Sequence, residues 1–426
     1  MLLTFGVSNH LSIRKYQQVS LMASKAIKDE AADLLEIAGT DDRALPAIVV
    51  YGANGSGKTN LLNSLDFLRQ TILKSHTQGG PDSSIPVSPF LLDENSAEQP
   101  TKLDCDLVVD GVRLSFGVSL CKQRIHEEYL YAYPNNRQQK WYHRRGDEIE
   151  FGRSLSGKNK ATFDLTRTNS LFLSAAANSN HEQLSKIYSY FQNTIVPYDE
   201  VPPFGQFNYK EFATDGESKT EVLKLLRDAD ISIVDISSAP KKESEKGKEF
   251  TTDFVALMEK HLGGRATEFA EQFTEANQVH QIRMMHKGDG DQNYPLPIDL
   301  ESRGTRTFLN LLAPAIEALR NGQVLIIDEL DTSLHSLLSK RLLSLFNRKE
   351  SNPHGAQLLF TTHDTNLLSP TCVRRDQVWF TEKSPIGETE AFPLTDFKTR
   401  KTDDYEKGYL EGRFGAVPII DEIASY

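Results

Sequence analysis

The sequence predicts an α/β fold in which a mixed, largely parallel core sheet carries an antiparallel β subdomain and a helical insertion. Residues 47–51 (AIVVY) indicate a buried strand, and a glycine-rich loop and leucines at helical spacing follow it. Two later apolar runs, residues 324–327 and 357–361, end in polar residues, as buried parallel strands do. Residues 103–118 alternate with period two around Asp110-Gly111, a dipeptide typical of a tight antiparallel hairpin.

Length and composition narrow the class of protein. The chain has 426 residues, enough for two or three domains or for one large domain with insertions. Its 38% hydrophobic and 25% charged residues are typical of a soluble globular protein. No run approaches the ~20 apolar residues of a membrane span. The N-terminus lacks a secretory signal pattern, and the three cysteines show no metal spacing. We therefore expect a cytoplasmic protein without a membrane partner.

The charge balance bears on nucleic-acid binding. The net charge of −11 argues against a strongly electrostatic binder, since such binding depends on Lys and Arg neutralising phosphates. One basic and aromatic segment, residues 138–145 (QQKWYHRR), could still form a local contact stripe. We favour a solvated hairpin for this segment.

Three regions follow from the changing periodicity. Residues 1–180 contain the glycine loop and the antiparallel strands, and a short amphipathic helix is expected over residues 25–37. Residues 181–280 are mostly helical in pattern and form the predicted insertion. Residues 281–426 return to strands and complete the core sheet.

The glycine loop at residues 52–59 matches G-x-x-x-x-G-K-[ST] between a strand and a helix, the context that such a phosphate-binding loop requires. Glycines allow positive φ and bring backbone N–H groups onto phosphates, and the helix N-terminus adds partial positive charge. Lys58 would face the β- and γ-phosphates, and Thr59 would ligate Mg²⁺. The predicted nucleotide-binding residues here are Gly52, Asn54, Gly55, Ser56, Gly57, Lys58, Thr59 and Asn60.

Two carboxylates, Asp328 and Glu329, directly follow the apolar run at residues 324–327. Adjacent carboxylates at the end of a buried strand are costly to desolvate, which argues against a purely structural role. Asp328 would hold Mg²⁺, directly or through water. Glu329 would orient and deprotonate the attacking water, as nucleotide hydrolysis requires.

Two further segments complete the candidate site. His363 follows the strand at residues 357–361, and its neutral imidazole could donate a hydrogen bond to the γ-phosphate. Ser302 and Gly304 lie in residues 301–305 (ESRGT), before a helix with one apolar face. At a helix N-terminus they would form an anion-binding cap.

Together these motifs resemble the ABC-type ATPases, which share a P-loop fold. Residues 52–59 are similar to the Walker A motif, residues 324–329 to Walker B, residues 301–305 to the signature, and His363 to the switch histidine. The resemblance implies ATP and Mg²⁺ as ligands, with Lys58, Glu329 and His363 as catalytic residues. It also implies a homodimer or higher homo-oligomer, in which the signature of one protomer covers the γ-phosphate at the other's phosphate loop.

Two departures separate the chain from transporter ATPases. His335 stands where those proteins have an aspartate, and about 240 residues separate Thr59 from Ser302. With residues 230–233 (DISI) and 408–418 (GYLEGRFGAVP), these features resemble the OLD-like AAA-family ATPases of bacterial anti-phage defence loci. That resemblance implies an ATP-hydrolysing switch that controls an effector and responds to a phage-encoded trigger. Since only about 60 residues follow His363, we expect the effector, a nuclease, to be a separate protein.

Some alternatives stay open. A RecF/SMC-like DNA-repair ATPase is the second hypothesis, although no sustained heptad run is present and the charge is acidic. Direct DNA binding is therefore undecided, while a transporter subunit is disfavoured by the departures above. The glutamine that couples such insertions to the nucleotide could be Gln70, Gln78 or Gln99.

Overall fold

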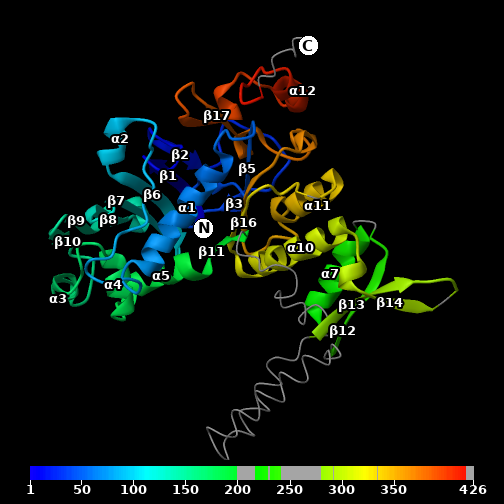
Figure 1. Cartoon of the computed structure of the whole chain (residues 1–426), viewed down its shortest axis with the longest axis horizontal. Coiled ribbons are helices and arrows are strands. Elements are labelled where there is room, and N and C mark those ends of the chain that lie inside the picture. Colours follow the sequence, from blue (N-terminus) through cyan, green and yellow to red (C-terminus); the bar gives the residue numbers. More distant parts are fainter. Residues whose placement is uncertain (199–215, 229–230, 241–279, 291, 333, 419–426) are drawn as a thin grey trace, which may run out of the picture. The chain divides into compact units, whose positions relative to one another are not determined.

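The computed structural model describes residues 1–198, 216–228, 231–240, 280–290, 292–332 and 334–418 (Figure 1). The chain forms two compact units, residues 1–200 with 313–426, and residues 201–312. This division differs from the boundaries expected at residues 180 and 280. Helix α5 (Glu182–Asn193) belongs to the first unit, and residues 241–279 of the expected insertion lie outside the described residues.

The core sheet of the first unit has six strands in the order β11-β15-β16-β5-β17-β18. Only β18 pairs antiparallel, and the other neighbours are parallel. The strands are β11 (Ile195–Pro197), β15 (Val324–Ile327), β16 (Gln357–Thr361), β5 (Ala47–Gly52), β17 (Val378–Lys383) and β18 (Thr389–Pro393). Every residue of β5, β15 and β16 is buried, which explains their continuous apolar sequences.

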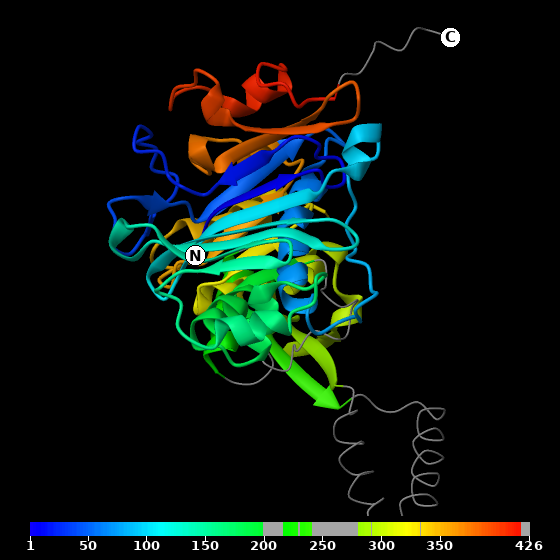
Figure 2. The ribbon, with the colours of Figure 1, turned by 90° about the vertical axis from the view of Figure 1, so that its left-hand side faces the viewer.

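The second sheet of this unit is antiparallel, with seven strands in the order β10-β9-β8-β7-β6-β1-β2 (Figure 2). They are β10 (Glu148–Phe151), β9 (Gln139–Arg145), β8 (Ile125–Ala132), β7 (Val112–Leu120), β6 (Thr101–Val109), β1 (Leu2–Ser8) and β2 (Gln17–Ser20). Asp110 and Gly111 connect β6 and β7 with φ of 49° and 76°, the pair of positive values that the sequence predicts for this turn.

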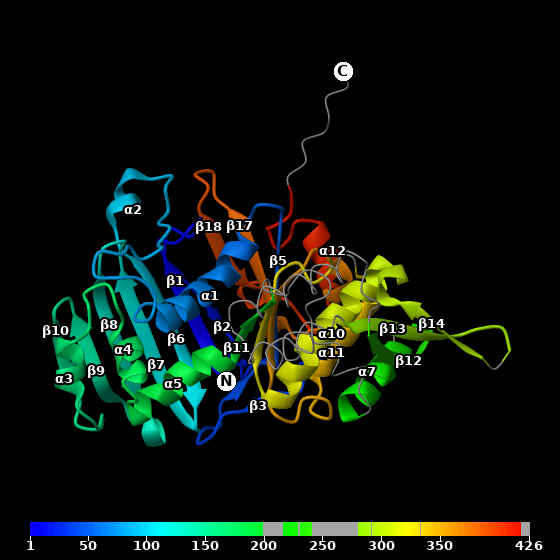
Figure 3. The ribbon, with the colours of Figure 1, turned by 60° about the horizontal axis from the view of Figure 1, so that its bottom comes forward.

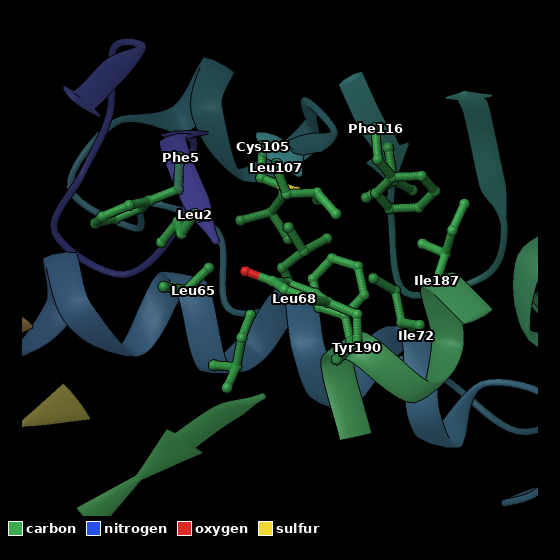
Figure 4. Close-up of a cluster of buried hydrophobic side chains, with 14 of the residues drawn as sticks. Leu2, Phe5, Leu65, Leu68, Ile72, Cys105, Leu107, Phe116, Ile187 and Tyr190 are labelled. Carbon is green, nitrogen blue, oxygen red and sulfur yellow. The ribbon is translucent and has the colours of Figure 1, made fainter. Parts of the chain in front are cut away.

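Helices α1 (Lys58–Lys74) and α5 lie against one face of the antiparallel sheet (Figure 3). Leu65 and Leu68 of α1 and Ile187 of α5 pack in one buried cluster with side chains of the sheet, such as Phe5 and Phe116 (Figure 4). This contact buries the apolar stripe of α1, so the helix that begins at the phosphate loop is fixed to the sheet. The predicted fold class, a mixed core sheet with an antiparallel β subdomain, is confirmed.

The helix predicted over residues 25–37 does not form, and this prediction was wrong. The segment is irregular and ends in a short strand, β3 (Leu35–Glu36), which pairs with β4 (Arg43–Ala44). Arg374 donates hydrogen bonds to the carbonyls of Ile27 and Asp29, and Arg375 binds the Asp29 carboxylate. Because these carbonyls are held by a distant arginine, they are not paired within a helix.

The second unit contains helix α7 (Glu217–Asp228) and a three-stranded antiparallel sheet in the order β12-β13-β14. Its strands are β12 (Ile233–Pro240), β13 (His280–Lys287) and β14 (Asn293–Pro297). Helix α10 (Arg303–Asn321) begins in this unit and continues into the first. Among the described residues, no helix is long and apolar enough to cross a membrane.

Candidate active site

The phosphate loop joins β5 to α1. Gly55 and Gly57 have φ of 76° and 103°, values that favour glycine. A Cβ at Gly57 would also lie 2.1 Å from Thr389 Oγ1, so this position excludes a side chain for two reasons. Lys58 Nζ donates to the carbonyls of Gly52 at 2.9 Å and Ala53 at 3.2 Å. Burial lowers the pKa of Lys58, and the nearby carboxylates, led by Asp328, oppose that shift.

Hydroxyl groups of two core strands, β17 and β18, form hydrogen bonds with the phosphate loop. Ser56 Oγ lies 2.7 Å from Thr381 Oγ1 of β17, and Thr389 Oγ1 of β18 donates to the Ser56 carbonyl at 2.8 Å. Asn60 donates to Ser12 Oγ at 2.7 Å. The side chains of Ser56 and Asn60 therefore bond protein groups, while Asn54 is exposed.

Asp328 lies directly after β15, beside Thr59. Thr59 Oγ1 donates to Asp328 Oδ2 at 2.7 Å, although 269 residues separate the two in sequence. Thr361 Oγ1 donates to the other carboxylate oxygen at 2.5 Å. A hydroxyl and a carboxylate oxygen side by side are the hard donors that Mg²⁺ prefers, so this pair fits the predicted magnesium ligands.

Glu329 has a φ of 51°, a left-handed conformation that is strained for a residue with a Cβ. Its backbone N–H donates to Thr361 Oγ1 at 2.7 Å, and its Oε2 accepts from Thr332 Oγ1 at 3.2 Å. The side chain is exposed. Non-glycine residues held in this conformation concentrate at functional sites, where the surroundings enforce them.

His363 follows β16, the strand between β15 and β5. Its backbone N–H donates to Asp331 Oδ1 at 3.1 Å, and its exposed imidazole has no hydrogen-bond partner among the described residues. On the other side, Tyr51 donates to the Asp364 carbonyl at 3.1 Å and Thr365 to Glu406 at 2.6 Å. The backbone around His363 is fixed, while its ring is free to meet a ligand.

Ser302 and Gly304 lie in the second unit. Ser302 Oγ accepts a hydrogen bond from the backbone N–H of Thr305 at 3.1 Å, the pattern of a helix N-cap. The preceding residue, Glu301, bonds His286 at 2.5 Å. The structure therefore shows the expected helix-cap arrangement, and the role of these residues at a phosphate stays a prediction.

The three coupling-glutamine candidates lie in two different places. Gln70 follows Lys58 by twelve residues in α1, about 18 Å along the helix axis. Gln70 and Gln78 line a cavity of about 300 Å³ at the far end of that helix. Gln99 ends helix α2 (Glu94–Glu98), where its carbonyl accepts from Asn9 at 2.7 Å. Neither Gln70 nor Gln78 is beside the phosphate loop.

Sequence reasoning brought Lys58, Thr59, Asp328 and Glu329 to one edge of the core sheet, and the structure places them there. It missed the residues whose hydrogen bonds fix the segments around the site, which are Ser12, Asp331, Thr361, Thr381 and Thr389. The hydroxyl residues follow no motif. Asp331 was the one visible signal, as a third acidic residue close behind Asp328 and Glu329.

A protein-family model described as "AAA domain, putative AbiEii toxin, Type IV TA system" matches residues 47–369. The match covers 323 of the 426 residues, from β5 to beyond His363. It therefore includes the phosphate loop, Asp328 and Glu329, and residues 301–305. No curated protein matches the chain.

Proposed function

Because the chain belongs to the AAA-domain family that this model describes, a family of ATPases, we propose that it is an ATP-hydrolysing switch in bacterial anti-phage defence. In this function it binds a separate effector protein, a nuclease, and controls the effector's release or activation. The observation that carries the nucleotide part is the hydrogen bond between Thr59 of the phosphate loop and Asp328 after β15. It joins the two halves of a magnesium–nucleotide site.

Each residue at this edge has a defined task in hydrolysis. Backbone N–H groups of the loop and the Lys58 ammonium bind the phosphates. Thr59 and Asp328 would hold Mg²⁺, which neutralises charge that develops on the phosphate oxygens. Glu329 orients the attacking water and accepts its proton, and His363 donates a hydrogen bond to the γ-phosphate.

We assign the ATPase to the ABC type and its active form to a homo-oligomer with ATP between protomers. The helix cap at Ser302, the strained Glu329 and the exposed His363 ring support this assignment. The combination of a long insertion with His335 supports a place among OLD-like ATPases, and we infer a likeness to the ATPase component of the PARIS anti-phage system (AriA).

The switch rests on differential affinity. If ATP stabilises one assembly and hydrolysis stabilises another, the effector can bind the two assemblies with different affinities. The free-energy difference between these affinities equals the amount by which the effector changes the affinity for ATP. The family description names a toxin of a Type IV TA system, which supports a setting where a harmful activity is held in check.

The test is purification of the native complex with ATP and with ADP, followed by size measurement and identification of its components. We expect a nuclease to co-purify with the wild type and to dissociate in only one nucleotide state. Lys58→Ala, which loses the charge facing the phosphates, should make both states alike. Lys349→Ala, at an exposed lysine outside the site, is the matched control.

Two results would contradict the proposal. One is a lone ATPase without any co-purifying protein. The other is ATP turnover that DNA stimulates and moderate salt abolishes, which would favour the RecF/SMC-like alternative.

A further inference from the structure

Two loops at the edge of the core sheet are joined to one another. The catalytic loop (residues 328–332) follows β15, and the switch loop (residues 361–365) includes the end of β16 and His363. Three of the contacts involve a residue with an assigned role, Asp328, Glu329 or His363, and their partners, Thr361 and Asp331, have none. Five hydrogen bonds connect the loops, namely Thr361 Oγ1 to Asp328 Oδ1, Glu329 N to Thr361 Oγ1, Leu330 N to the Thr361 carbonyl, Thr362 Oγ1 to Asp331 Oδ1 and His363 N to Asp331 Oδ1.

Asp331 accepts two of these bonds with a single oxygen. Its Oδ1 lies 2.7 Å from Thr362 Oγ1 and 3.1 Å from the backbone N of His363. Hydrogen bonds to an ionised carboxylate are stronger than those between neutral groups. Asp331 also lies two residues after Glu329, in the same short turn, where Thr332 N donates to the Glu329 carbonyl. One carboxylate therefore ties the backbone of His363 to the loop that carries Glu329.

The opposite side of the switch loop has independent anchors. Tyr51, from the strand before the phosphate loop, and Glu406, from helix α12 (Tyr405–Leu410), bond the residues after His363. Removing the Asp331 carboxylate thus leaves the loop attached at its far end. The expected consequence is a displaced His363, not an unfolded segment.

We propose that Asp331 is a positioning residue, which fixes the switch loop to the catalytic loop so that His363 and Glu329 keep one mutual arrangement during hydrolysis. The inference rests on the proposed ATPase function and deepens it. A γ-phosphate that attracts His363 thereby also acts on the loop of Glu329, because the two loops move together. A displacement of about 1 Å at such groups can reduce turnover by up to about 100-fold.

The first experiment is a double-mutant cycle on the full chain, with Asp331→Ala, His363→Ala and both together. We expect Asp331→Ala to lower kcat by about 10- to 100-fold with KM for ATP almost unchanged. In the His363→Ala background the same change should cost less than about twofold, since residues that act through each other are not additive. Asp331→Asn keeps an Oδ1 acceptor and should restore most of the turnover.

A second measurement does not depend on turnover. Hydrogen exchange of peptides that cover residues 361–367 should accelerate in Asp331→Ala and stay near the wild type in Asp331→Asn, because only alanine frees the His363 amide.

The outcomes separate this inference from the proposed function. A wild-type chain that does not hydrolyse ATP would overturn both. If the wild type turns over ATP, an Asp331→Ala chain with normal kcat would overturn the inference alone. The inference would also be overturned if Asp331→Ala lowered kcat equally with and without His363. Unchanged hydrogen exchange over residues 361–367 in Asp331→Ala would overturn it too.

Discussion

Two ionic sites in the first unit use the same kinds of side chain for different purposes. In the antiparallel sheet, Glu128 of β8 and Arg144 of β9 are 0% and 1% exposed at the side chain, with 3.8 Å between Oε2 and Nη1. Glu128 also accepts from the backbone N–H groups of Phe172 and Leu173 and from the Tyr142 hydroxyl, at 2.7 to 2.9 Å. Burial raises the pKa of Glu128, and Arg144 and these hydrogen bonds oppose that shift.

At the phosphate loop the carboxylates are partly exposed to solvent. Glu329 is exposed, Asp328 is half-buried, and the hydrogen bonds of Lys58 Nζ within the described residues go to loop carbonyls. The backbone is strained at Glu329 and unusual at two glycines, whereas the Glu128 site uses ordinary strands and a helix start. Charges that the protein satisfies itself stabilise the fold, and charges that it leaves accessible are available to a ligand.

The largest expected effect is on catalysis at the open site. Glu329→Gln removes the proposed proton acceptor, so we expect ATP turnover to fall by about 10²- to 10⁴-fold with nucleotide binding retained. Single-turnover kinetics and nucleotide titration measure the two quantities. The melting temperature should stay close to that of the wild type, because the side chain is exposed. Turnover at the wild-type rate would show that Glu329 is not the catalytic base.

The next effect is on stability at the closed site. Glu128→Ala leaves Arg144 buried without its counter-charge, which should cost about 3–5 kcal/mol in the free energy of unfolding. Denaturant titration measures this value. Glu148→Ala, an exposed carboxylate on β10, is the control and should change stability by less than about 0.5 kcal/mol. Equal losses of stability in Glu128→Ala and Glu148→Ala would show that the buried ion pair does not stabilise the fold.

A smaller loss tests one hydrogen bond of the closed site. Tyr142→Phe removes the hydroxyl that donates to Glu128 Oε1 while keeping the buried ring, so stability should fall by about 1.5–3 kcal/mol. Tyr133→Phe, at a partly exposed position, is the matched control. Unchanged stability in Tyr142→Phe would mean that the backbone N–H groups alone satisfy this carboxylate.

The smallest effect concerns strain at the open site. Glu329→Gly and Glu329→Ala both remove the carboxylate, but only glycine accepts a φ of 51° without strain. Glu329→Gly should therefore be about 1 kcal/mol more stable than Glu329→Ala, although glycine gives the unfolded chain more conformational entropy. Thermal unfolding of the two variants side by side measures the difference. An alanine variant of equal or greater stability would show that the strain is released locally.

The sequence predicted what local patterns encode. Strand β5, the loop after it and the leucines of α1 are adjacent in the chain, so their arrangement follows from periodicity and motif. The edge that gathers Lys58 and Asp328 was also predictable, because parallel strands present their carboxyl ends together.

Long-range partners were not predictable in the same way. Thr381 and Thr389 bond Ser56 across more than 300 residues, and a threonine in a strand carries no sign of such a partner. The expected helix over residues 25–37 failed for a related reason, since a distant arginine, Arg374, donates to the carbonyls of Ile27 and Asp29. The domain boundary also differed, because α5 has the pattern of an insertion helix but packs on the antiparallel sheet.

The hydrogen bonds of Thr381 and Thr389 with Ser56 have a consequence for biosynthesis. Ser56 leaves the ribosome 325 and 333 residues before Thr381 and Thr389, the strand residues that complete its hydrogen bonds. At roughly 5–20 residues per second, a nascent chain presents the loop without this support for about 16 to 70 seconds. The phosphate loop can therefore acquire its full set of hydrogen bonds only after β18 has been translated.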